Sequence, residues 1–194
     1  MPNISSHMIV CKLVSEKLNI KSDDFIKGNL LPDIIDKDDS HHKVWSKLYL
    51  IPNIDYFLDN LDLTKDINIG YLVHLMLDKY YLLYLEDKYP NDMVFDNGIY
   101  NDYDYINYDL VNRFNLDIDY LSKILCNYNC KINEEKLKYN IGYLKQKKIG
   151  KTKYLEIEDF SNFLYNVSNI ISKELVSYAD KYSMFSICIR KWKE

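Results

Sequence analysis

The chain contains four histidines, and each one lies either on an apolar helical stretch or beside a run of aspartates. His74 occurs in the apolar sequence GYLVHLMLD, and Asp78 follows it by four residues. That spacing places both side chains on one face of a helix. Because an aspartate is rarely buried unless it is paired or bound to a cation, the pair indicates either a structural hydrogen bond or part of a metal site.

The remaining histidines extend this pattern. His7 lies in the first turn of the first predicted helix, on its apolar side. The sequence GNLLPDIIDKDDSHH carries Asp33 and ends in the adjacent histidines His41 and His42. Imidazole nitrogens and carboxylate oxygens together suit zinc, iron, manganese or cobalt. We therefore expect these side chains to converge on a divalent metal site.

The ligand set that this expectation defines is His7, Asp33, His41, His74 and Asp78. Two metal ions about 3.5–4 Å apart need a bridging carboxylate and terminal ligands on each side. This set provides both kinds of ligand and leaves positions open for water and substrate. Helical bundles build such sites from inward-facing carboxylates and histidines on neighbouring helices.

Each of these residues also has an ordinary structural explanation. His74 can be a core histidine that is hydrogen-bonded to Asp78, and His7 can be a structural residue near the N-terminus. Asp33 follows a proline, as turn residues often do, and histidines in a polar loop are usually on the surface. The prediction of a metal site therefore rests on the combination and not on any one residue.

The segments MPNIxxH, GNLLPD, DSHH and GYLVHLMLD occur in this order within residues 1–90. Their order resembles that of the zinc-dependent phospholipase C family, in its short intracellular branch. In that family a histidine opens a helix, GxxxPD supplies an aspartate ligand, a Ser-His pair follows, and HxxxD lies on a central helix. The resemblance implies an all-α fold with the metal ions in the core of the bundle.

The resemblance also assigns roles to residues of this chain. It implies the ligand set named above, with Asp78 as the bridging ligand and Asp33 as a general base. His41 follows the serine and is preferred over His42 as the ligand. No histidine occurs after His74, so the third metal that secreted members of the family bind is not expected. The prediction is one or two ions, with zinc as the first choice and iron or manganese as alternatives.

The function that these residues predict is metal-dependent hydrolysis of a phosphoester through a metal-activated water. The substrate would be a small phosphorylated molecule, such as a phosphodiester, a phospholipid head group or a nucleotide. The catalytic residues would be Asp33 and Asp78. The alternative is a non-catalytic binding or scaffold protein that keeps the phospholipase C-like helical fold. The sequence has no Walker loop, no GxSxG motif and no Rossmann fingerprint.

The net charge of −4 over 194 residues gives no general affinity for nucleic acid. Lysines gather between residues 131 and 153, and this basic segment is either a solvated helix face or a surface for an anionic partner. No signal sequence and no apolar run of about 18 residues is visible, so we expect a cytoplasmic protein with reduced thiols. The sequence does not define the oligomeric state.

The elements that must position these side chains are predicted from apolar periodicity, which indicates an all-α, single-domain helical bundle over residues 1–194. In this scheme residues 1–90 form the metal-site half, 91–107 a surface loop, and 108–194 the C-terminal helices. The expected helices cover residues 5–18, 42–50, 54–61, 65–89, 108–114, 117–128, 133–147 and 157–187.

The segment between the first helix and the histidine pair is predicted to be mostly irregular. A short helical turn is expected to end at Gly28, and Pro32 favours an irregular loop over residues 29–40. The helix over residues 65–89 is apolar around most of its circumference, which is typical of a buried central helix. We therefore expect His74 to lie in the core, with Asp33 on a loop beside it.

Overall fold

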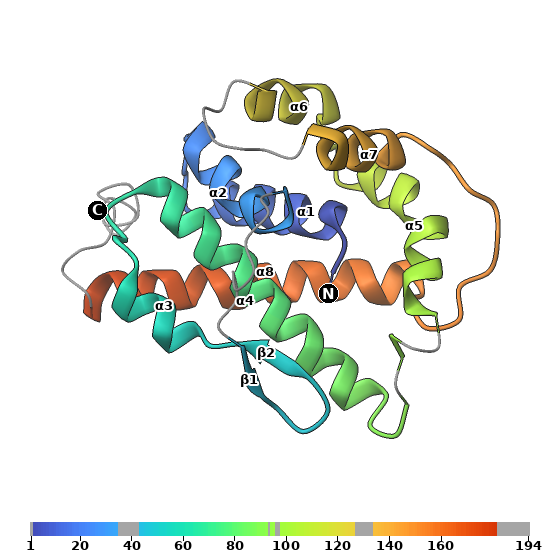
Figure 1. Cartoon of the computed structure of the whole chain (residues 1–194), viewed down its shortest axis with the longest axis horizontal. Coiled ribbons are helices and arrows are strands. Elements are labelled where there is room, and N and C mark those ends of the chain that lie inside the picture. The colour runs from blue at the N-terminus through green and yellow to red at the C-terminus, as the bar shows by residue number, and fades with distance from the viewer. Residues whose placement is uncertain (1, 35–42, 93, 96–97, 127–133, 182–194) are drawn as a thin grey trace.

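The computed structural model describes residues 2–34, 43–92, 94–95, 98–126 and 134–181. Eight helices and one two-stranded antiparallel sheet are present in these residues (Figure 1). The helices are α1 (Ile4–Lys17), α2 (Asp23–Ile34), α3 (Ile54–Asn60), α4 (Asp66–Lys88), α5 (Ile99–Arg113), α6 (Ile118–Cys126), α7 (Glu134–Leu144) and α8 (Ile157–Lys181). The strands are β1 (Lys43–Trp45) and β2 (Leu50–Pro52). The predicted all-α class is therefore confirmed.

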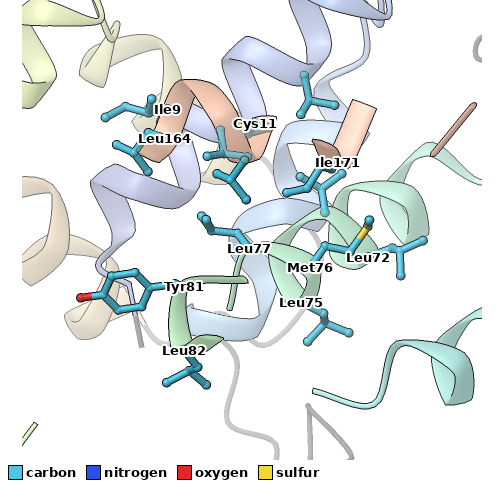
Figure 2. Close-up of a cluster of buried hydrophobic side chains, with 14 of the residues drawn as sticks. Ile9, Cys11, Leu72, Leu75, Met76, Leu77, Tyr81, Leu82, Leu164 and Ile171 are labelled. Atoms are coloured by element: carbon cyan, nitrogen blue, oxygen red, sulfur yellow. The ribbon is translucent and has the colours of Figure 1, made fainter. Parts of the chain in front are cut away.

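Helix α4 forms the centre of the structure, and α1, α2, α3 and α8 pack against it. Its buried side chains extend from Ile69 to Leu85 and point to more than one side of the helix. Figure 2 shows a cluster to which three helices contribute, with these labelled residues: Ile9 and Cys11 of α1, Leu72, Leu75, Met76, Leu77, Tyr81 and Leu82 of α4, and Leu164 and Ile171 of α8. The expectation of a buried central helix is confirmed.

Helices α2 and α4 cross with their backbones in contact, because a glycine lies on each side of the crossing. A Cβ atom on Gly28 would lie 1.8 Å from the carbonyl oxygen of Ile67. A Cβ atom on Gly70 would lie 1.9 Å from the carbonyl oxygen of Phe25. A larger residue at either position would force the helices apart. The close approach brings the backbone of α2 next to the polar residues of α4.

Helix α2 continues through Gly28 and Pro32 to Ile34. The predicted helix end and the predicted loop were therefore wrong for residues 29–34. Pro32 removes one backbone hydrogen bond, but it does so in the last turn of the helix. The side chains of Leu30 and Ile34 are buried there, and their packing outweighs the lost bond.

A β-hairpin occupies the segment in which a helix over residues 42–50 was predicted, and His42 itself lies outside the described residues. Glu86 of α4 holds the turn of this hairpin. Its carboxylate accepts hydrogen bonds from the Ser46 hydroxyl at 2.7 Å and from the Leu48 amide at 2.5 Å. The prediction of a helix was wrong because the turn is stabilised by Glu86, which lies on another element 40 residues after Ser46.

Helix α5 begins at Ile99, inside the segment 91–107 that was predicted to be a surface loop. Although the segment is mostly polar, its apolar residues form one stripe along the helix. The buried residues of the stripe recur at helical spacing: Ile99, Tyr103, Ile106 and Leu110. The loop prediction was therefore wrong from Ile99 onward.

The predicted helices over residues 5–18, 54–61, 117–128, 133–147 and 157–187 agree in position with α1, α3, α6, α7 and α8, and the one over 108–114 is the last part of α5. Residues 127–128 and 133 of these predictions lie outside the described residues. The described part of α8 ends at Lys181, and the last residues of the predicted helix, 182–187, lie outside it. Among the helices of the described ranges, none is long and apolar enough to cross a membrane.

Lysines of the basic segment face carboxylates of α5 and α6. In its described part three of them form ion pairs: Lys145 with Asp119 at 2.6 Å, Lys147 with Asp109 at 3.5 Å, and Lys148 with Asp104 at 2.8 Å. These contacts pair three lysines of the segment with carboxylates at the surface, as is common on a solvated helix face. A surface for an anionic partner stays the alternative prediction.

Candidate metal centre

Side chains from α1 and α4 meet in the core. His7 comes from α1, and His74 and Asp78 come from α4. The atoms that they would offer to a metal ion lie within 4.8 Å of one another. All three side chains are fully buried. The spacing of four residues within α4 places His74 and Asp78 on one face of the helix, as expected from the sequence.

Asp78 turns one carboxylate oxygen toward each histidine. Its Oδ1 lies 3.4 Å from Nε2 of His7, and its Oδ2 lies 3.5 Å from Nε2 of His74. Both distances exceed that of a good hydrogen bond. Within the described part of the chain, neither ring nitrogen of His7 has a hydrogen-bond partner. A buried imidazole of this kind needs compensation, and a cation between its nitrogen and the carboxylate would supply it.

The imidazole rings of His7 and His74 lie parallel, with centroids 3.7 Å apart and planes that differ by 8°. The lone pair of each ring lies in the plane of that ring, so an ion in the plane of one ring lies out of the plane of the other. The distance between the rings is similar to the distance of about 3.5–4 Å between the ions of a dinuclear site.

The distances between the histidine nitrogens and the Asp78 oxygens are close to those between two ligands of one metal ion. Two ligand atoms that are each about 2.1 Å from one tetrahedral zinc ion lie about 3.4 Å apart. The distances from Asp78 to His7 and to His74 are 3.4 and 3.5 Å. The spacing thus suits Asp78 as a bridging ligand, which is the role that the family resemblance implies.

Asp33 is the member of the cluster that reaches the surface. It comes from α2, its side chain is 20% exposed, and its Oδ1 lies 4.0 Å from Nε2 of His74. This distance is longer than that between two ligands of one tetrahedral zinc ion, about 3.4 Å, so Asp33 would either shift slightly or act through a water. Since His7, His74 and Asp78 are fully buried, Asp33 is the member of these four residues that solvent reaches.

Burial and the neighbouring carboxylates set the protonation of the two histidines. Burial, together with the charge on His74, lowers the pKa of His7. Burial also acts to lower the pKa of His74, but the carboxylates of Asp78 and Asp33 outweigh it and raise this pKa. Without metal, a neutral His7 therefore lies beside a more basic His74. The neutral imidazole of His7 is the form that binds a metal ion.

Asn29 is a residue of the site that the sequence analysis did not identify. Its backbone carbonyl accepts a hydrogen bond from Nδ1 of His74 at 2.7 Å. This bond places a proton on Nδ1 and turns Nε2 toward the carboxylates. In the orientation that satisfies its amide, the Asn29 side chain donates to the carbonyl of His7 at 2.9 Å and accepts from the backbone amide of His74 at 3.3 Å. Asn29 lies four residues before Asp33, and this helical spacing was the feature of the sequence that could have identified it.

The structure therefore brings together most of the predicted ligand set: His7, Asp33, His74 and Asp78. The fifth predicted ligand, His41, and the alternative His42 lie outside the described residues. Asp33 belongs to helix α2 and not to the loop in which it was expected. The last turn of α2, which contains Pro32, is thus the element that positions it.

Comparisons with known protein families, with curated proteins and with solved structures found no match. The resemblance to the zinc-dependent phospholipase C family therefore rests on the motifs alone. The arrangement of Asp33, His74, Asp78 and His7 is the geometric observation from which a function can be proposed.

Proposed function

We propose that the protein is a metal-dependent hydrolase of a phosphoester. The observation that carries this proposal is that Asp78 faces the Nε2 atoms of two stacked, buried histidines, at nitrogen–oxygen distances of 3.4 and 3.5 Å. This is the ligand spacing expected for two zinc ions that share one carboxylate. Zinc is the expected metal, with iron or manganese as alternatives.

Bound metal would supply a water of lowered pKa and would neutralise charge on the phosphoryl group. The chain contributes orientation and proton transfer. His74 is held in place by its hydrogen bond to the carbonyl of Asn29, and Asp78 holds its two oxygens toward the histidines. Asp33, at the exposed edge, is placed to accept the proton of the attacking water. The buried surroundings exclude bulk water, which strengthens the electrostatic effects of these groups.

The substrate in this proposal is a small phosphorylated molecule: a phosphodiester, a phospholipid head group or a nucleotide. It would enter past Asp33, whose side chain is 20% exposed, whereas the other three side chains are fully buried. A cytoplasmic location belongs to the same proposal.

Metal analysis of tag-free protein, purified without added metal or chelator, is the first test. We expect about one or two equivalents of a transition metal. Asp78→Asn should lose this metal, because it removes the shared carboxylate. The matched variant Asp87→Asn changes an exposed aspartate of the same helix and should retain it. A folded protein that holds no metal and takes up none from added zinc would contradict the proposal.

Hydrolysis of a phosphodiester such as bis(p-nitrophenyl) phosphate, and of nucleotides, is the second test. Asp33→Asn should still bind metal through the buried ligands and should lose about 100-fold or more of the rate, because it removes the proton acceptor. Equal rates for Asp33→Asn and the wild-type protein would exclude Asp33 as the general base.

The complete burial of His7, His74 and Asp78 favours one alternative. In this alternative the protein binds or organises a partner, and the cluster, with or without metal, serves only to stabilise the core. Zinc would then raise the unfolding temperature, but no phosphoester would be hydrolysed. The two tests together distinguish the alternative from the hydrolase.

A further inference from the structure

The β1–β2 hairpin exposes apolar side chains that nothing in the metal centre requires. Val44 is 43% exposed, Trp45 73% and Leu50 41%. Figure 1 shows the hairpin at the edge of the molecule beside α4, on the side away from α6 and α7. Large exposed apolar groups that lie together are typical of a binding surface.

The hairpin is held firmly, so this exposure is a fixed feature of the surface. The Ser46 hydroxyl and the Leu48 amide donate to Glu86 of α4 at 2.7 and 2.5 Å. The Ser46 amide donates to the carbonyl of Tyr49 at 2.8 Å, and the ring of Tyr49 is buried edge-on against Phe95. Trp45, the last residue of β1, is therefore next to a turn that is held by α4 and by the ring of Tyr49.

Apolar side chains project from both faces of this two-stranded ribbon. Trp45 pairs with Leu50, and Val44 pairs with Ile51 on the neighbouring register position. Because successive side chains of a strand point to opposite faces, Trp45 and Val44 lie on opposite sides. Ile51, on the side of Val44, is half-buried and packs against the core. Trp45 and Leu50 form the more exposed face of the ribbon.

The charges of the hairpin favour an anionic lipid surface as the partner. Lys43 and Lys47 are exposed, and within the described ranges neither forms an ion pair. This differs from the basic segment, where Lys145 and Lys148 are paired with carboxylates. Two unpaired cations beside an exposed tryptophan suit the boundary between phosphate head groups and acyl chains.

We propose that the hairpin docks the protein on a membrane surface that contains anionic lipids. Trp45 and Leu50 enter the boundary region, and Lys43 and Lys47 contact head-group phosphates. The proposal does not depend on the metal centre. It concerns attachment to a lipid surface, whatever substrate the metal centre takes.

Sedimentation with vesicles tests this proposal, using phosphatidylcholine with and without phosphatidylglycerol. The wild-type protein should bind the anionic vesicles. Trp45→Ala should lower the partition coefficient by about tenfold, and the double variant Lys43→Ala, Lys47→Ala by about tenfold on anionic vesicles only. The matched control Ile149→Ala removes an almost fully exposed side chain from the connection between α7 and α8 and should bind like the wild-type protein.

Fluorescence gives a second readout. The chain has two tryptophans, so Trp192→Phe leaves Trp45 as the reporter, and its emission should shift to shorter wavelength on anionic vesicles. Wild-type protein that binds no vesicles, or Trp45→Ala that binds as well as Ile149→Ala, would overturn the proposal. A concentration-dependent dimer that Trp45→Ala abolishes, without vesicle binding, would overturn it too and would assign the hairpin to a contact between copies of the chain.

Discussion

Asp78 and Asp102 are both buried carboxylates, but they are compensated by different kinds of neighbour. Asp102 of α5 accepts hydrogen bonds from the consecutive backbone amides of residues 153–155, at 2.9, 2.6 and 2.9 Å. Asp78 faces the side chains of His7 and His74 at 3.4 and 3.5 Å. Backbone amides cannot release their protons or bind a metal, whereas imidazoles do both. The arrangement around Asp102 therefore stabilises the fold, whereas the arrangement around Asp78 is compatible with metal binding or proton transfer.

The largest effect that we predict concerns Asp102. Asp102→Ala should lower the free energy of unfolding by about 3–5 kcal/mol, because it leaves the amides of residues 153–155 without their acceptor in a buried place. Urea unfolding followed by circular dichroism measures this loss. Zinc uptake per folded molecule should not change, since Asp102 lies outside the candidate metal centre. A loss of zinc uptake in folded Asp102→Ala would show that the two carboxylates are not independent.

The second prediction concerns stabilisation by zinc, which should depend on Asp78 and not on Asp102. Zinc at about 100 times its Kd should raise the free energy of unfolding of the wild-type protein by about 2.7 kcal/mol, because only the folded state holds the site. Asp78→Asn should gain nothing from zinc, and Asp102→Ala should gain the same increment as the wild-type protein. Thermal unfolding with and without zinc measures both. An equal increment in Asp78→Asn would exclude Asp78 as a ligand.

The third prediction concerns Asn29, which positions the histidines. Asn29→Leu should weaken zinc binding by about 10–100-fold, as is usual when a group that orients a ligand is lost. The backbone carbonyl that bonds Nδ1 of His74 remains, so the effect comes from the lost side-chain tie to the carbonyl of His7. Competition with a chromophoric zinc chelator measures the affinity. Unchanged affinity would make Asn29 a packing residue only.

Residues of the candidate site could be predicted where their relation is local in the chain. His74 and Asp78 are four residues apart on a helix whose apolar character is evident, so their shared face follows from helical geometry. The roles of Asn29 and Asp102 depend on partners 45 and more than 50 residues away. No periodicity in the sequence indicates such pairs, although Asn29 shares a helix face with Asp33.

The errors in the predicted fold have the same origin. Pro32 is compatible with helix α2 because the helix crosses α4 at Gly28 and Gly70, where packing outweighs a local preference. The hairpin forms where a helix was predicted because Glu86 of α4 accepts its turn amide and hydroxyl. In both places a contact distant in sequence overrides the local signal.

The smallest predicted effect comes from a third carboxylate, Asp104, which lies two residues after Asp102 on the surface of α5. Partial burial acts to raise its pKa, but hydrogen bonds from Lys148 and Tyr143 outweigh this and lower the pKa. A carboxyl group whose pKa is lower in the folded state stabilises that state above its ordinary pKa of about 3.9, and loses this contribution as the pH falls through the lowered value.

Asp104→Asn should therefore cost only about 0.5 kcal/mol at neutral pH, because the pair with Lys148 is solvent-screened, and less in high salt. The difference from the wild-type protein should disappear as the pH falls below the lowered pKa. Urea unfolding at a series of pH values measures it. If Asp104→Asn lowered the free energy of unfolding nearly as much as Asp102→Ala, the location of a carboxylate on α5 would determine its contribution to stability. The kind of hydrogen-bond donor would then not matter. A small, pH-dependent cost would confirm that the kind of neighbour decides.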